Sequence, residues 1–165
     1  METRIKVLES LGKIKLKQKE QWYCDSCGEI INSAKEGMLE WDCLTDDEIG
    51  EDGLNTKNFR IVHHKGSSSF KHCQTSNTVY NFCDGHLNWY TYSNGLSELL
   101  SFYNHKVDSQ ELNEIIRRLH VDFYEEARIY IDKALEDGYE YDPYQTGHYS
   151  DEELLNLIEK YAERS

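Results

Sequence analysis

The stretch QWYCDSCGE, residues 21–29, decides the fold that this sequence predicts. Its two cysteines, Cys24 and Cys27, are three positions apart, and Gly28 follows directly. This spacing predicts a tight turn that directs two thiolates toward one point, which is half of a tetrahedral zinc site. The other two ligands must come from elsewhere in the chain, and their identity determines whether the metal serves chemistry or structure.

A second pair of metal-binding residues occurs in FCDGHL, residues 82–87, where Cys83 and His86 are also three positions apart. The leucines from Leu87 to Leu100 predict a helix that begins at this pair. Ligands three apart share one face of a helix, and a helix N-terminus favours a thiolate. A knuckle, a hairpin and a ligand pair on a helix form the layout of a treble-clef zinc finger. We therefore predict that Cys24, Cys27, Cys83 and His86 hold one structural Zn²⁺, with no open position for water.

Two further residues are reserve ligands in this prediction. Cys73 replaces Cys83 if a strand, rather than the helix, supplies the third thiolate. His63 and His64 are adjacent and lie in a predicted strand, so they point to opposite faces and at most one of them faces the metal. We keep Cys73 and His64 as the reserves.

The cysteine content and the apolar runs predict where the protein is found. The five cysteines are an odd number at uneven spacings, and the first residues lack the pattern of an export signal. These features favour a reducing compartment and metal binding over disulfides. Cys43 follows Trp41 in an apolar stretch and is expected in the core. No apolar run is long enough to cross a bilayer. We expect a cytoplasmic protein with no membrane contact.

Charge is unevenly distributed along the chain. The formal net charge is −13, but residues 1–19 hold six Lys and Arg against two Glu, a net of +4. Such a chain repels phosphates, because nucleic-acid affinity comes largely from Lys and Arg. It attracts basic surfaces instead. The composition also fits a generic acidic protein, but it favours a basic protein partner and no direct contact with nucleic acid.

The hydrophobic period changes near residue 107, from short strands to helices. The predicted strands are 13–17, 29–31, 38–41 and 58–63, and capping boxes at Asp108, Asp122 and Ser150 begin three helices. We therefore expect an α+β fold, with a zinc-binding treble-clef-like module over residues 1–107. An α-helical region, residues 108–165, is expected to pack on it. This region has six Lys and Arg against sixteen Asp and Glu, and with the tyrosine-rich linker 139–149 it is the expected binding face.

The chain between residues 24 and 86 resembles the zinc-bearing HNH nucleases, which are relatives of the treble clef. The resemblance lies in the elements CDSC, IVHHK, an Asn and FCDGH, in this order. The resemblance implies that His63 and His64 are the metal-binding and general-base pair and that Asn77 or Asn81 is the middle asparagine. Those enzymes carry a final histidine directly after the second knuckle, where this chain has Leu87. The resemblance covers roughly residues 22–90 and indicates the fold more than the activity.

A small, strongly acidic chain with a structural zinc also resembles the phage-encoded anti-CRISPR proteins that inhibit RNA-guided type II nucleases. This resemblance implies an acidic surface that competes for the basic channel where the nuclease holds nucleic acid. It also implies a viral protein that acts in the host cytoplasm.

Most catalytic patterns are missing from the sequence. The chain has no phosphate-binding glycine loop, no G-x-S-x-G elbow and no HExxH. His72 and Cys73 are adjacent, and neighbouring positions seldom form a nucleophile–base pair. We expect a non-enzymatic zinc protein that binds and inhibits a basic RNA-guided nuclease. The alternatives are an HNH-like metal-dependent nuclease and a bacterial regulatory zinc-finger module.

Overall fold

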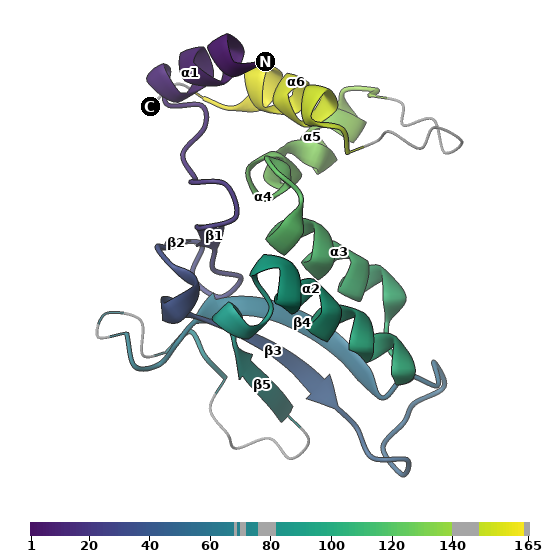
Figure 1. The fold of residues 1–165 in the computed structure, drawn as a ribbon. Coiled ribbons are helices and arrows are strands. Elements are labelled where there is room, and N and C mark those ends of the chain that lie inside the picture. The colour runs from purple at the N-terminus through teal and green to yellow at the C-terminus, as the bar shows by residue number, and fades with distance from the viewer. Residues whose placement is uncertain (68, 70–71, 76–81, 140–148, 164–165) are drawn as a thin grey trace. The chain divides into compact units, whose positions relative to one another are not determined.

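The computed structural model of the chain describes residues 1–67, 69, 72–75, 82–139 and 149–163. The fold is α+β, as predicted, with small antiparallel sheets and several helices (Figure 1). The chain divides into two compact units. The larger unit is residues 19–120, and the smaller unit combines residues 1–18 with residues 121–165.

Every strand in the described part of the chain belongs to the larger unit. A two-stranded hairpin pairs β1 (Trp22–Tyr23) with β2 (Ile30–Ile31), and the 3-10 turn η1 (Ala34–Glu36) follows. An antiparallel sheet has the order β4-β3-β5, formed by β4 (Thr56–His63), β3 (Gly37–Cys43) and β5 (Phe82–His86). Met38 of the central strand lies opposite Val62 on one side and His86 on the other.

Two helices cover one face of this sheet (Figure 1). The helices are α2 (Tyr92–Ser101) and α3 (Ser109–His120), with the 3-10 turns η2 (Leu87–Trp89) and η3 (Phe102–Asn104) on either side of α2. Asp108 caps α3 as predicted, because its Oδ1 accepts from the backbone N–H groups of Gln110 and Glu111. The core between sheet and helices is formed by large apolar side chains that include Leu39, Ile61, Leu87, Leu99, Leu112, Ile115 and Leu119.

The smaller unit is helical and has its own core. Its elements are α1 (Glu2–Ser10), α4 (Tyr124–Ala127), η4 (Arg128–Tyr130), α5 (Ile131–Glu136) and α6 (Asp151–Tyr161). Ser150 caps α6 as predicted, since the N–H of Glu153 donates to its Oγ. Gly138, at φ +79°, ends the preceding helical segment. None of the helices in the described part of the chain is long and apolar enough to cross a bilayer.

The predicted strand over residues 13–17 does not form. The backbone N–H groups of Lys15 and Leu16 both donate to Oε2 of the buried Glu126, at 2.9 and 2.8 Å, instead of to a neighbouring strand. The alternation of lysine with apolar residues therefore reflects a segment that buries Ile14 and Leu16 without any sheet partner. The helix α1, which precedes this segment, was not predicted.

The boundary between the units also differs from the expected one at residue 107. Helix α3 belongs to the larger unit because Leu112, Ile115 and Leu119 are buried in its core. The basic first residues belong to the same unit as the acidic C-terminal region, and Arg4 pairs with Glu159 of α6 at 2.6 Å. The C-terminal acidity is therefore partly offset within its own unit. Most of the tyrosine-rich linker, residues 140–148, lies outside the described residues.

Candidate metal centre

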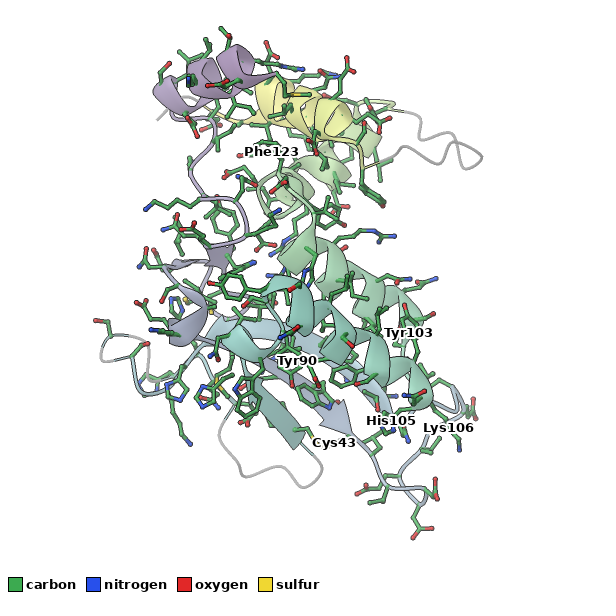
Figure 2. All side chains as sticks on the ribbon, viewed as in Figure 1. Cys43, Tyr90, Tyr103, His105, Lys106 and Phe123 are labelled. Carbon is green, nitrogen blue, oxygen red and sulfur yellow. A yellow bond between two sulfur atoms is a disulfide. The ribbon has the colours of Figure 1, made fainter. Side chains whose placement is uncertain are left out.

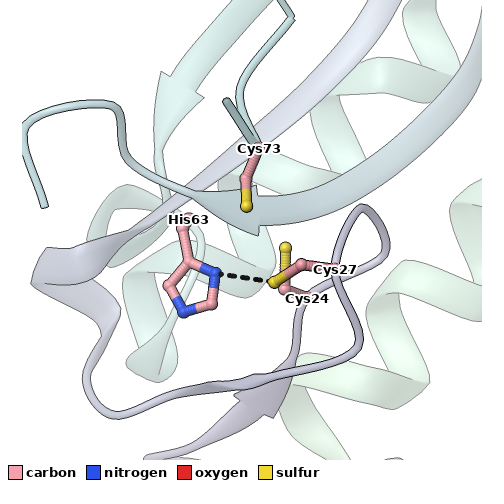
Figure 3. Close-up of side chains that lie close together, drawn as sticks. All are labelled: Cys24, Cys27, His63 and Cys73. Carbon is pink, nitrogen blue, oxygen red and sulfur yellow. Dashed lines mark hydrogen bonds between the residues drawn. The ribbon is translucent and has the colours of Figure 1, made fainter. Parts of the chain in front are cut away.

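Three cysteines and one histidine of the larger unit converge on one point (Figure 3). They are Cys24, Cys27, His63 and Cys73, and their sulfur and nitrogen donor atoms all lie within 4.8 Å of one another. Cys24, His63 and Cys73 are buried, and Cys27 is exposed. A group of soft sulfur donors with one imidazole is consistent with a metal-binding site.

The two-cysteine knuckle is shaped by its own backbone. The N–H of Cys24 donates to the carbonyl of Glu29, and the N–H of Gly28 donates back to the carbonyl of Cys24, both at 2.9 Å. Gly28 has a φ of +77°, which side chains with a Cβ rarely adopt. The short hairpin β1–β2 thus closes a turn in which Cys24 and Cys27 both face the cluster.

Asp25, inside the knuckle, fixes this turn to the rest of the unit. Its backbone N–H donates to the carbonyl of Ile61, and its Oδ2 accepts from the N–H of Ile61 at 2.7 Å. The same oxygen accepts from the buried guanidinium of Arg118, which also donates to the carbonyl of Tyr23. The knuckle is therefore held against β4 and α3 by backbone pairing and by a charged side-chain contact.

His63 is oriented toward the cysteines by a contact on the far side of its ring. Its Nδ1 lies 3.5 Å from Sγ of Cys27 (Figure 3). Its Nε2 lies 3.3 Å from the carbonyl oxygen of Ile30. An Nε2–H that donates to this carbonyl leaves the lone pair of Nδ1 facing the sulfurs. Such a carbonyl contact is the usual way in which proteins fix the ring of a metal-binding histidine.

Cys73 comes from a loop segment, and the two residues after it hold that segment on the sheet. Gln74 is buried, accepts from the N–H of Lys65 and donates to Asp84. Thr75 donates from its N–H and its hydroxyl to the carboxylate of Glu40, which is fully buried. These contacts place the sulfur of Cys73 opposite the knuckle.

The three neighbouring thiols of the cluster hinder one another's ionisation. Burial, with the contacts to Cys27 and Cys24 adding to it, raises the pKa of the Cys73 thiol to about 12. Like charges that share one site oppose each other's ionisation, so three thiolates do not coexist here without compensation. A bound divalent cation supplies that compensation, because thiols that coordinate such an ion are deprotonated.

The structure brings only part of the predicted ligand set together. Of the six predicted ligands, it places Cys24, Cys27 and the reserve Cys73 in the cluster. Cys83 is not available as a ligand, because it forms a disulfide with Cys43, which is labelled in Figure 2. The disulfide corrects the expectation of a chain without disulfides, and Cys43 is half-buried rather than in the core as expected.

His86 and His64 also lie outside the cluster. Their rings neighbour each other, with centroids 5.2 Å apart, and His64 Nδ1 accepts from the N–H of Gly66. The pair Cys83 and His86 does not begin a helix but lies in β5, which pairs with β3. Residues three apart on a strand point to opposite faces, so this pair does not converge on one ion.

His63 is the ligand candidate that the first set missed, although the sequence contains a signal for it. Phe59, Ile61 and His63 alternate along β4, and all three are buried, whereas Asn58 and Arg60 point the other way. Val62, two positions before His64, is buried as well, so the signal that favours His63 is the longer alternation of apolar Phe59 and Ile61 with polar Asn58 and Arg60.

The remaining residues of the nuclease pattern do not assemble a second cluster in the described part of the chain. Leu87, at the position of the final nuclease histidine, is fully buried in the core. Asn77 and Asn81 lie outside the described residues. Comparisons with protein-family models, with curated proteins and with solved structures find no match for this chain.

Proposed function

We propose that this chain is a non-enzymatic, zinc-stabilised protein that binds a basic protein surface and acts as an inhibitor of an RNA-guided nuclease. The observation that carries the proposal is the cluster of Cys24, Cys27, His63 and Cys73. Four protein ligands fill a tetrahedral coordination sphere, which is the arrangement of structural zinc sites, whereas catalytic sites keep one position open.

The donor set supports zinc as the metal. Three thiolates and one imidazole form a common structural zinc set, with Zn–S bonds of about 2.3 Å that place sulfurs about 3.8 Å apart. The donors of the cluster already lie within 4.8 Å of one another, so small side-chain movements suffice for binding. The metal would join the knuckle, the end of β4 and the segment that carries Cys73.

Several features weigh against the nuclease alternative. His63, one of the two histidines of the nuclease pattern, faces Cys27 and has its Nε2 at the Ile30 carbonyl. The position of the final nuclease histidine is the buried Leu87. The net charge of −13 disfavours binding to phosphates.

The charge supports a basic partner. Both compact units are acidic by sequence, with a net charge of −7 for residues 19–120 and −6 for the remainder. An acidic surface of this kind accelerates association with a basic surface, and the acceleration decreases as salt increases. The basic channel of an RNA-guided nuclease is a surface of this type.

The test measures DNA cleavage by a panel of guide-loaded type II nucleases with and without the zinc-loaded chain. We expect inhibition of at least one nuclease, and direct binding that weakens as salt is raised from 50 to about 300 mM. Lysozyme, a basic protein of unrelated function, serves as the control for non-specific attraction. Equal binding to lysozyme and to every nuclease, without inhibition, would refute the inhibitor proposal.

The same preparation tests the nuclease alternative. The zinc-loaded chain is incubated with plasmid and single-stranded DNA in Mg²⁺, Mn²⁺ or Ni²⁺, and we expect no cleavage. Cleavage that is abolished by His64→Ala would establish the alternative instead.

A further inference from the structure

A pocket of about 460 Å³ lies at the start of α2, and none of the four donors of the metal centre lines it. It is lined by a single segment of chain: Asn88, Trp89, Tyr90, Thr91, Tyr92, Asn94, Gly95 and Glu98. Trp89 is 56% exposed and Tyr92 is 75% exposed, which makes them the most exposed aromatic side chains of the larger unit among the described residues. Two large aromatic rings at the edge of a pocket are typical of binding surfaces.

The backbone builds this pocket at a cost in local strain. Tyr92, the first residue of α2, has a φ of +62°, a left-handed conformation that side chains with a Cβ rarely adopt. Strain of this kind persists where the surrounding structure enforces it, and it occurs often at binding sites. Gly95 contributes as well, because a Cβ there would lie 2.2 Å from the carbonyl carbon of Tyr90. The close approach of α2 to Tyr90 thus requires a glycine.

The charges around the pocket indicate what it accepts. The exposed carboxylate of Glu98 lines the pocket, and Asp84 lies on the neighbouring strand β5. Burial raises the pKa of the Tyr90 hydroxyl to about 12, and the charges of Glu98 and Asp84 contribute to the shift. The sequence has no Lys or Arg between residues 72 and 105. Aromatic rings beside a carboxylate attract a cation.

We propose that this pocket binds an arginine side chain of a basic partner protein, with its guanidinium stacked on Trp89 or Tyr92 and hydrogen-bonded to Glu98. Arginine fits better than lysine because its planar guanidinium stacks on aromatic faces and presents a fork of donors to a carboxylate. The inference rests on the proposed function, and it places the binding face on residues 88–98 rather than on the C-terminal helices.

The first experiment tests the chemistry of the pocket in the full, zinc-loaded chain. The probe is the blocked peptide acetyl-Gly-Arg-Gly-amide, and the matched control replaces arginine with citrulline, which has the same shape without the charge. Binding is followed by NMR of the ¹⁵N-labelled protein. We expect shifts of the Trp89 indole and of backbone signals from residues 88–98 with the arginine peptide, at millimolar affinity, and much smaller shifts with citrulline.

Trp89→Ala and Glu98→Gln should each abolish the response, whereas Tyr103→Ala, which removes an exposed aromatic side chain outside the pocket, should retain it.

The second experiment uses the same variants against a guide-loaded nuclease that the wild-type chain inhibits. We expect Trp89→Ala and Glu98→Gln to weaken binding at least about tenfold, as is usual for a central interface residue, and Tyr103→Ala to leave it unchanged. Zinc content and unfolding temperature should match the wild type for all three variants.

The outcomes separate this inference from the proposed function. Equal shifts with both peptides, or shifts outside residues 88–98, would overturn the arginine pocket, and the first result would indicate an uncharged ligand such as a sugar. Wild-type inhibition that survives Trp89→Ala and Glu98→Gln would overturn the pocket as the partner site while the proposed function stands. If the pocket selects the arginine peptide but the chain binds no nuclease, the proposed partner is refuted. The inference that the pocket binds arginine side chains then still stands.

Discussion

Arg118 of α3 forms a 2.7 Å ion pair with Asp25, a residue between the two cysteines of the knuckle. The Arg118 side chain is only 4% exposed, and its guanidinium also donates to the carbonyl of Tyr23. This pair joins two parts of the chain that are 93 residues apart. It makes α3 a structural support of the metal centre although the helix contributes no ligand.

The first prediction concerns this pair. Asp25→Ala leaves a buried guanidinium without its carboxylate, which costs about 3–5 kcal/mol in other proteins, and it also removes the acceptor for the N–H of Ile61. We expect a loss of this size in the free energy of unfolding, measured by chemical denaturation of the zinc-loaded protein. The control is Glu2→Ala, which breaks the exposed pair with Lys6 and should change stability by no more than about 1 kcal/mol. Similar losses in both variants would contradict the structural role of the Asp25–Arg118 pair.

The second prediction distinguishes the two ligand sets. His63→Ala and Cys73→Ser should each lose zinc, measured by elemental analysis after purification, because each removes one of the four donors of the cluster. His86→Ala and the double variant Cys43→Ser with Cys83→Ser should retain one zinc per chain, since these residues lie outside the cluster. Zinc that is kept in His63→Ala and Cys73→Ser but lost in His86→Ala and in the double cysteine variant would contradict the cluster. It would support the ligand set predicted from the sequence.

Local patterns were sufficient to predict the knuckle, three of the strands and two of the helix caps. Cys24 and Cys27 are three positions apart, and Asp108 and Ser150 act on backbone groups within three residues. Their geometry is therefore set by local chain conformation, which sequence patterns report directly.

The pairing of distant ligands was not predictable in this way. Cys73 reaches the knuckle because Gln74 and Thr75 bond to Asp84 and Glu40, and nothing in the sequence periodicity reports such contacts. Cys83 was predicted in a helix because leucines follow it, whereas pairing with β3 places it in a strand beside Trp41. Sheet pairing is a long-range interaction and overrides a short local preference.

The third prediction concerns the pH dependence of stability. Burial lowers the pKa of His120 below its ordinary value of 6.5, and the charge of Lys19 adds to this, against the opposing contact of Nε2 with the Tyr90 carbonyl. Between the lowered pKa and about 6.5 the unfolded chain binds more protons than the folded chain, so stability rises with pH in this window. We expect the free energy of unfolding to fall on acidification from pH 7 to about pH 5, and to fall less in His120→Gln. An identical pH dependence in the two proteins would rule out His120 as a contributor.

The fourth prediction concerns the strained residue at the start of α2. Tyr92→Gly and Tyr92→Ala both remove a side chain that is 75% exposed. Of the two residues introduced, only glycine adopts a φ of +62° without strain. Tyr92→Gly should therefore be more stable than Tyr92→Ala by about 1–2 kcal/mol, measured by denaturant unfolding. Both variants should bind the arginine peptide more weakly than the wild type. Equal stability of the two variants would show that the left-handed conformation relaxes at no cost.

The division into units has a consequence for the order in which this chain folds. Residues 19–120 form one uninterrupted stretch inserted between the two halves of the smaller unit. During synthesis, all four candidate ligands emerge before α6, the partner of Arg4, has been made. The metal centre can therefore assemble on the nascent chain, whereas the buried Leu8 of α1 joins a core only after α6 has been made. Residues 1–18 therefore precede the metal centre in the chain but complete their native packing only after residues 121–165 are available.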